Sequence, residues 1–188
     1  KRFIEVHKGI SPKKKDLLYI LSSYSRFLGR VIIKDPGILD LLLASEFIQN
    51  KKQLEKTIQE SNGIFESSST LEEFMAQLRR YKYRELSRII YRDIMHLERF
   101  PEIMEGLSDL ASGILDAAFK FFDREVKATS HGRFAIIGMG KLGGSELNLS
   151  SDIDLIYIYQ TTGKPDLFFK IAERITKSLS SVTEDGFL

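Results

Sequence analysis

The chain has 188 residues, 43% of them hydrophobic and 29% charged, as in a soluble globular protein with one large domain or two small ones. It has no cysteine, which excludes disulfides and thiolate metal sites. The net charge is only +2, and no run approaches the roughly 18 apolar residues of a membrane span, so neither a nucleic-acid nor a membrane partner is predicted. The first residues do not form a secretory signal, which favours a cytoplasmic location, and the missing initiating Met suggests a piece of a longer protein.

The first two-thirds of the sequence, to residue 129, is predicted to be helical. Ser11-Pro12 and Asp35-Pro36 each place a capping residue before a proline, which is typical of a helix start. Apolar residues at helical spacing follow both signals. A short polar helix is expected over residues 51–59, and Asn62-Gly63 predicts a turn after it.

A long helix is predicted to open at Thr70, because Thr70 and Glu73 have the spacing of a capping box. Phe100-Pro101 should end it, and the next helix should run to Val126. Four arginines recur on the long helix at the spacing of one face, namely Arg80, Arg84, Arg88 and Arg92. They form either a basic wall beside a nucleotide or acidic partner, or a solvated face paired with neighbouring acids such as Glu85 and Asp93.

The pattern changes after residue 130. Phe134–Ile137 is a short apolar run that predicts a buried strand, and a glycine-rich loop follows over Gly138–Gly144. Ile153–Tyr159 is rich in β-branched and aromatic residues and predicts a second strand. One more helix is expected over Leu167–Leu179. The predicted fold class is therefore α+β.

Two acidic residues two positions apart, Asp152 and Asp154, are predicted to lie on a strand. Alternate side chains of a strand share a face, so both carboxylates should point the same way. Adjacent carboxylates repel each other, and a divalent cation removes that repulsion. Mg²⁺ binds proteins through one or two carboxylates plus substrate phosphates, which makes these two aspartates candidate metal ligands and catalytic residues.

The turn at Gly143, Gly144 and Ser145 lies just before the acids. Backbone without side chains can approach a phosphate closely and present its N–H groups, and the Ser145 hydroxyl adds a donor. Lys141 is either a further phosphate contact or a solvated loop lysine. Asn148 and Ser151 are near enough in sequence to orient the acids, although turn formation explains them equally well.

The segment Gly138–Gly143 also matches the G-x-G-x-x-G fingerprint of dinucleotide-binding proteins. That fingerprint requires a helix to open at the last glycine. Here small and polar residues of low helix propensity follow, which argues against it. A P-loop is excluded, because Gly144 stands where the lysine belongs.

A glycine-glycine-serine turn followed by Asp-x-Asp between strands resembles the nucleotidyltransferase signature. More closely, residues 138–156 resemble the bacterial glutamine synthetase adenylyltransferase/adenylyl-removing enzyme family, which shows G-M-G-K-L-G-G-x-E-L-N-x-S-S-D-I-D-L-I. Residues 78–93, 107–111 and 168–187 also resemble this family. The resemblance implies a helical region over 1–129 and a nucleotidyltransferase catalytic domain over 130–188, with a mixed β-sheet and flanking helices.

Proteins of this family carry two catalytic modules, one that attaches AMP to a tyrosine of glutamine synthetase and one that removes it by phosphorolysis, releasing ADP. Residues 146–148 with 150–154, and residues 183–187, are more similar to the N-terminal, removing module. The resemblance implies Mg²⁺, phosphate and ADP or ATP as ligands, with glutamine synthetase and the nitrogen-regulatory PII protein as partners. Alternatives are the attaching module, a nucleotidyltransferase that acts on nucleic acid or a small molecule, and a regulatory fragment that only binds nucleotide or protein. In the second case the face from Arg80 to Arg92 should bind nucleic acid with a steep salt dependence.

The sequence departs from the family pattern at its end. The family continues into a strand reading V-D-x-R-L-R-P, whose acid is a third metal ligand, whereas this sequence stops at Leu188. The resemblance therefore implies a truncated catalytic domain, and we expect little or no activity from these residues alone.

Overall fold

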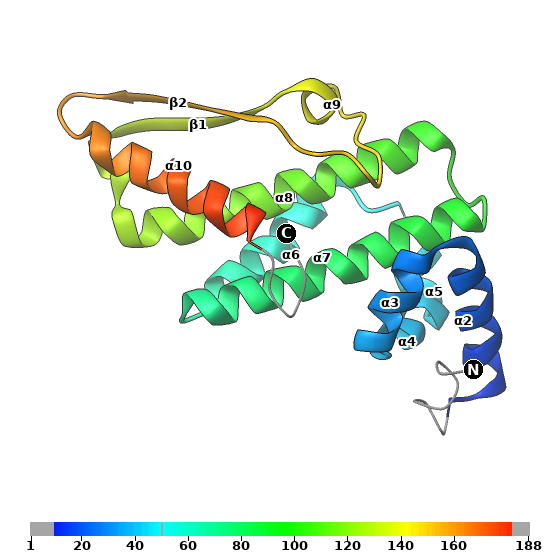
Figure 1. Cartoon of the computed structure of the whole chain (residues 1–188). Helices are drawn as coiled ribbons and strands as arrows, with labels where there is room; N and C mark the ends of the chain where they lie inside the picture. The colour runs from blue at the N-terminus through cyan, green and yellow to red at the C-terminus, as the bar shows by residue number, and fades with distance from the viewer. Residues whose placement is uncertain (1–9, 50, 182–188) are drawn as a thin grey trace. The chain divides into compact units, whose positions relative to one another are not determined.

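The computed structural model describes residues 10–49 and 51–181 (Figure 1). In chain order its elements are α2 (Pro12–Tyr24), α3 (Arg26–Lys34), α4 (Gly37–Leu43), α5 (Ser45–Gln49), α6 (Leu54–Ser67), α7 (Leu71–Ile94), α8 (Phe100–Val126), η1 (Ala128–His131), β1 (Gly132–Gly138), α9 (Gly140–Gly143), β2 (Leu155–Thr161) and α10 (Pro165–Ser180). This order confirms the α+β class. Among these helices, none combines the length and apolar character needed to cross a membrane.

The chain divides into two compact units. The first comprises Lys1–Lys51 and Tyr83–Arg99, and the second comprises Lys52–Lys82 and Phe100–Leu188. Helix α7 contributes its C-terminal half to the first unit and its N-terminal half to the second. The functional division at residues 129 and 130 stays a prediction, because packing units and functional domains need not coincide.

The first unit has its own apolar core, formed by residues at helical spacing on α2 to α5 and by one residue of α7. Its buried members are Leu17, Leu18, Leu21, Leu28, Val31, Ile32, Ile38, Leu39, Leu42, Ile48 and Ile90. The start signal of α2 is confirmed, since the Ser11 hydroxyl accepts a hydrogen bond from the Lys14 amide. Burial of these aliphatic side chains is the main stabilising contribution to the unit.

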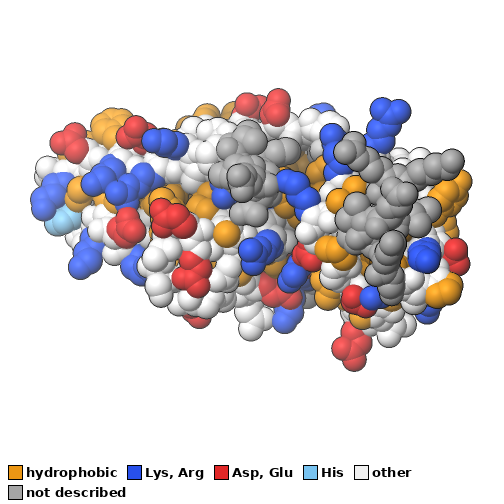
Figure 2. Space-filling view, turned by 60° about the horizontal axis from the view of Figure 1, so that its bottom comes forward, with side chains coloured by type: hydrophobic (Ala, Val, Ile, Leu, Met, Phe, Trp, Pro, Cys, Tyr) orange, Lys and Arg blue, Asp and Glu red, His pale blue; other side chains and the backbone are white. Residues whose placement is uncertain are grey.

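The four arginines of α7 do not form a single solvated face. Arg80 and Arg84 are exposed, whereas Arg88 and Arg92 are 5% and 4% exposed. Arg88 donates to the Glu85 carboxylate at 2.9 Å, the predicted partner, but within the buried interior. Arg92 binds the Ile48 carbonyl and Glu98 instead. Figure 2 shows acidic and basic side chains interspersed on the face it presents.

The second unit is built on α8. The capping box of α7 is confirmed, because Glu73 accepts from the Ser69 amide and donates its own amide to the Thr70 hydroxyl. The turn predicted at Asn62-Gly63 is wrong, since α6 continues to Ser67. Asn62 donates to Asp116 of α8 at 3.0 Å, and this packing outweighs the turn preference of the dipeptide.

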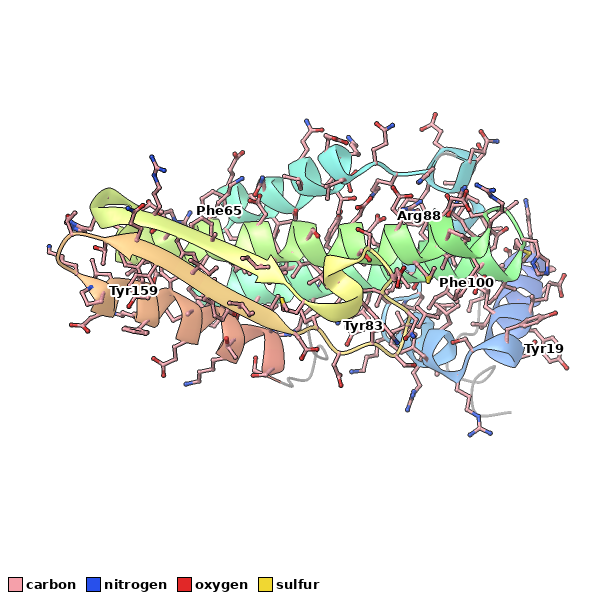
Figure 3. All side chains as sticks on the ribbon, turned by 90° about the horizontal axis from the view of Figure 1, so that it is seen from above. Tyr19, Phe65, Tyr83, Arg88, Phe100 and Tyr159 are labelled. Carbon is pink, nitrogen blue, oxygen red and sulfur yellow. The ribbon has the colours of Figure 1, made fainter. Side chains whose placement is uncertain are left out.

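Strands β1 and β2 pair antiparallel, with Gly132 opposite Thr161 and Gly138 opposite Leu155. The mixed sheet expected from the family resemblance is therefore not what the described residues form. Phe134 of β1 joins the sheet to α8 by stacking on Phe119, with the two ring centroids 5.4 Å apart. Its ring centroid lies 6.1 Å from that of Phe168 on α10. Figures 1 and 3 both show the two strands running along α8 and α10.

Candidate functional site

The connection between the two strands, residues 139–154, contains every predicted site residue. It begins with the one-turn helix α9, continues through a turn at Gly144 and Ser145, and reaches β2 through a segment without regular secondary structure. The Met139 amide donates to the Asp154 carbonyl at 2.9 Å, which joins the two ends of the connection. The glycine-rich turn and the acids are thereby held on one loop.

Gly143 is required by the packing of the loop upon itself. A Cβ at this position would lie 2.5 Å from the Gly138 carbonyl oxygen, which no real Cβ tolerates. At Gly144, by contrast, the nearest atom would be 3.6 Å away, an ordinary contact. Of the two adjacent glycines, only Gly143 is therefore explained by internal contacts.

The backbone N–H groups of the turn are already used within the loop. The amide of Gly143 donates to Met139 at 3.2 Å, that of Gly144 to Gly140 at 3.0 Å, and that of Ser145 to Leu142 at 3.1 Å. The expectation that these amides face a phosphate does not match this geometry. The side chains of Ser145 and Lys141 are both exposed and can donate to a ligand.

Ser145 has a left-handed backbone conformation, with φ of 56°. A non-glycine residue in this region is strained by about 1–3 kcal/mol and persists only where its surroundings fix it. The flanking residues supply that support, since Leu142 and Leu147 are 8% and 5% exposed. The Glu146 amide closes the turn by donating to the Lys141 carbonyl at 2.7 Å.

Helix α8 contributes a contact that the motif did not reveal. The Ser108 hydroxyl accepts a hydrogen bond from the Leu147 amide at 3.2 Å, in a buried position. Ser108 precedes Leu147 by 39 residues, and its only sequence signal is its place in the family-like segment 107–111.

Asp152 and Asp154 lie in the irregular segment before β2, not on the strand as predicted. Their common face is nevertheless supported, because both are exposed while Ile153 and Leu155 are partly buried. Within residues 10–49 and 51–181, neither carboxylate has a protein partner, and no cluster of three or more potential metal ligands occurs. Two free carboxylates on one face suit Mg²⁺ that completes its shell with water and substrate phosphate.

Asn148 and Ser151 bond to each other and not to the acids. The Ser151 hydroxyl accepts from the Asn148 amide at 3.0 Å, and the Asn148 side chain accepts from the Ser150 amide at 3.0 Å. These are turn contacts. They fix the segment that leads directly into Asp152, and a more specific role in orienting the carboxylates stays a prediction.

The dinucleotide-binding alternative is contradicted by the topology. That fingerprint belongs to a strand, a helix and a second strand in parallel. Here β1 and β2 are antiparallel, and α9 ends at the glycine where the long helix should open.

Comparison with known proteins identifies the family. A sequence model described as glutamate-ammonia ligase adenylyltransferase matches residues 15–188. Several similar relatives are named bifunctional glutamine synthetase adenylyltransferase/adenylyl-removing enzyme. The one from Pseudomonas syringae pv. tomato is 32% identical over 184 residues, covering 87% of this chain and 19% of the relative. That from Pseudomonas putida is 30% identical over 198 residues, covering 95% and 20%.

A relative of the same name from Nitrosococcus oceani is 35% identical over 140 residues, which cover 64% of this chain and 14% of the relative. The chain thus spans about a fifth or less of the length of these relatives. The matched region includes the whole loop from Met139 to Asp154. With a family match over nearly its entire length, the chain belongs to the glutamate-ammonia ligase adenylyltransferase family.

Proposed function

We propose that the chain contributes the catalytic site of an enzyme that removes AMP from adenylylated glutamine synthetase by phosphorolysis. The observation that carries the proposal is the pair of exposed, unpartnered carboxylates on the loop that also holds Ser145, in a member of an adenylyltransferase family. Phosphate oxygen attacks the AMP phosphorus, the bond to the tyrosine oxygen breaks, and the products are ADP and free tyrosine.

Each residue of the loop has a proposed part in this reaction. Asp152 and Asp154 would hold Mg²⁺, which supplies positive charge beside the phosphates when bound. Ser145 and Lys141 would contact phosphate oxygens through their side chains. Gly144 would let the backbone of the turn lie close to the ligand, since nothing in the loop itself requires a glycine there.

The removing reaction is preferred over the attaching one on sequence grounds. Residues 146–148 and 150–154 are more similar to the removing module, as are residues 183–187, which lie outside the described part of the chain. The names of the relatives include both activities, so the attaching reaction, which uses ATP, is the second candidate. The PII protein as a partner and a cytoplasmic location belong to the same proposal.

A nucleotidyltransferase that acts on nucleic acid is disfavoured. That alternative relied on an exposed basic face from Arg80 to Arg92, and burial of Arg88 and Arg92 removes half of that face from solvent. The regulatory alternative is a fragment that only binds nucleotide or protein. The activity assay below distinguishes it from an enzyme.

The test uses a longer protein that contains this sequence and continues through the V-D-x-R-L-R-P strand of the family pattern, supplied with Mg²⁺, inorganic phosphate and adenylylated glutamine synthetase. ADP that requires phosphate and is lost in Asp152→Asn supports the removing reaction. Glu173→Gln is the matched control, because Glu173 is an exposed acid of α10 in the same unit. AMP transfer from ATP to unmodified glutamine synthetase, without ADP formation, would favour the attaching reaction. If neither ADP nor AMP transfer is detected, the proposal is contradicted.

A further inference from the structure

One side chain of α8 fixes the site loop from outside it. Ser108 is 3% exposed, and its hydroxyl makes two hydrogen bonds with distinct roles. It donates to the Met104 carbonyl of its own helix at 2.9 Å. With its proton so directed, its oxygen accepts from the Leu147 amide at 3.2 Å.

The position of Leu147 in the loop makes this bond important. Leu147 comes two residues after the strained Ser145 and one residue before the Asn148 turn that leads into the acids. The backbone amides of Ser145 and Glu146 donate to Leu142 and Lys141 of the same loop, so these bonds move with it. The bond to Ser108 instead attaches the loop to α8, a long helix whose own position is fixed by the core of the second unit.

The Leu147 amide is buried, so it has no solvent to bond with if Ser108 is removed. A buried N–H without an acceptor is costly, and the loop can avoid that cost only by moving until the amide finds water or another acceptor. Such movement shifts Ser145 on one side and Asp152 on the other, because both are joined to Leu147 by short turns.

We propose that Ser108 is a positioning residue of the phosphate and metal site, which acts by holding the loop 142–151 on α8 through the Leu147 amide. It is not a catalytic residue, since it is buried and bonds only to backbone. The inference rests on the proposed function for its chemical consequence, although the tether itself can be measured separately.

Ser112 provides a matched control one turn further along the same helix. Its hydroxyl donates to the Ser108 carbonyl at 2.9 Å, just as the Ser108 hydroxyl donates to the carbonyl four residues before it. Among the described residues, no bond from Ser112 to the loop is seen. Ser108→Ala and Ser112→Ala therefore both remove a helix-bonding hydroxyl, and only the first removes the acceptor of the Leu147 amide. Ser108→Thr keeps a hydroxyl and should therefore retain the slow exchange of the Leu147 amide and the affinity of the site.

Two quantities are measured on each variant, namely the hydrogen-exchange rate of the Leu147 amide by NMR and the affinity for Mn²⁺ with ADP. We expect Ser108→Ala to accelerate exchange at Leu147 by about tenfold or more and to weaken Mn²⁺–ADP binding several-fold, while Ser112→Ala changes neither. Ser108→Cys, which keeps the side-chain size with a weaker acceptor, is measured in parallel and decides the question if Ser108→Ala does not fold.

Equal exchange and equal affinity in the Ser108 and Ser112 variants would overturn the inference. Faster exchange at Leu147 with unchanged affinity would confirm the tether and overturn its role in the site. If the unaltered chain does not bind Mn²⁺–ADP, the proposed function and the positioning role in that site are both contradicted, and the exchange rates still establish whether Ser108 holds the loop.

Discussion

Two adjacent glycines of the site loop are predicted to respond in opposite ways to the same added methyl group. In Gly143→Ala the new Cβ would lie 2.5 Å from the Gly138 oxygen and 3.3 Å from the Gly138 carbonyl carbon, both backbone atoms that no side-chain rotation can move aside. The loop must shift as a whole. Overpacking of this kind costs about 1–3 kcal/mol of the free energy of unfolding.

In Gly144→Ala the same methyl group meets nothing closer than 3.6 Å, and the backbone has φ of −87° and ψ of 0°, the conformation of the third residue of a type I turn, which is open to alanine. The free energy of unfolding should stay the same or rise by about 0.4–1 kcal/mol, because alanine restricts the unfolded chain. Urea unfolding followed by circular dichroism measures both variants against the unaltered chain.

The two variants also distinguish a glycine that the fold requires from one that ligand binding requires. If Gly144 lies close to a bound phosphate, Gly144→Ala should weaken Mn²⁺–ADP binding while leaving stability intact. Equal stability losses in both variants would refute the described loop geometry. Full stability and full affinity in Gly144→Ala would refute the proposed contact between this glycine and the ligand.

Three further predictions concern packing, a buried ion pair and pH. Gly113→Ala should cost about 1–3 kcal/mol of unfolding free energy, because its Cβ would lie 2.8 Å from the Thr57 methyl carbon and 3.3 Å from the Thr57 carbonyl oxygen. Glu85→Gln should cost up to about 3–5 kcal/mol, because it removes the negative charge that lies 2.9 Å from the buried Arg88 guanidinium. Burial lowers the pKa of Lys82 to about 8 from 10.5, so its contribution to stability should rise between pH 8 and pH 10.5, as unfolded chains hold the proton longer.

Urea unfolding checks all three, with controls drawn from the same chain. Gly63→Ala on α6 has open space around its Cβ and should not destabilise. Asp40→Asn breaks an exposed pair with Lys14 and should cost at most about 1 kcal/mol. For Lys82, the unaltered chain should gain stability relative to Lys82→Met as the pH rises through that window. Losses as large in the controls, or a stability difference that does not change with pH, would contradict these predictions.

Local signals in the sequence predicted the starts of α2 and α7. Ser11-Pro12 and the box from Thr70 to Glu73 specify caps through atoms only a few residues apart, and both caps form. The turn predicted at Asn62-Gly63 was wrong because contacts with a segment distant in sequence outweigh the local preference of the dipeptide. The Asn62 side chain bonds to Asp116, which lies 54 residues away.

The sequence predicts a list of candidate site residues, which stays a prediction, but it does not predict the geometry of the loop that carries them. The spacing of Asp152 and Asp154 predicted their common exposed face, which the alternating burial supports. Whether the amides of Gly143 and Gly144 are free depends on which carbonyls the folded loop brings near them, and composition does not reveal that. Ser108 was missed for the same reason, since one serine in a helix resembles any other until its partner is known.

The burial of Arg88 and Arg92 illustrates the same limit. A spacing of four residues places side chains on one helix face, but it does not say whether solvent or protein covers that face. Here Glu85, Glu98 and the Ile48 carbonyl receive the two inner arginines.

The central claim is that Asp152 and Asp154 hold a divalent cation together with a nucleotide phosphate. Isothermal titration of the chain with Mn²⁺ in the presence of ADP tests it directly, with Asp152→Asn, Asp154→Asn and the control Glu173→Gln. The account predicts binding in the unaltered chain and in Glu173→Gln, with loss in both aspartate variants. Binding that survives either aspartate substitution, or that is lost equally in Glu173→Gln, would contradict it.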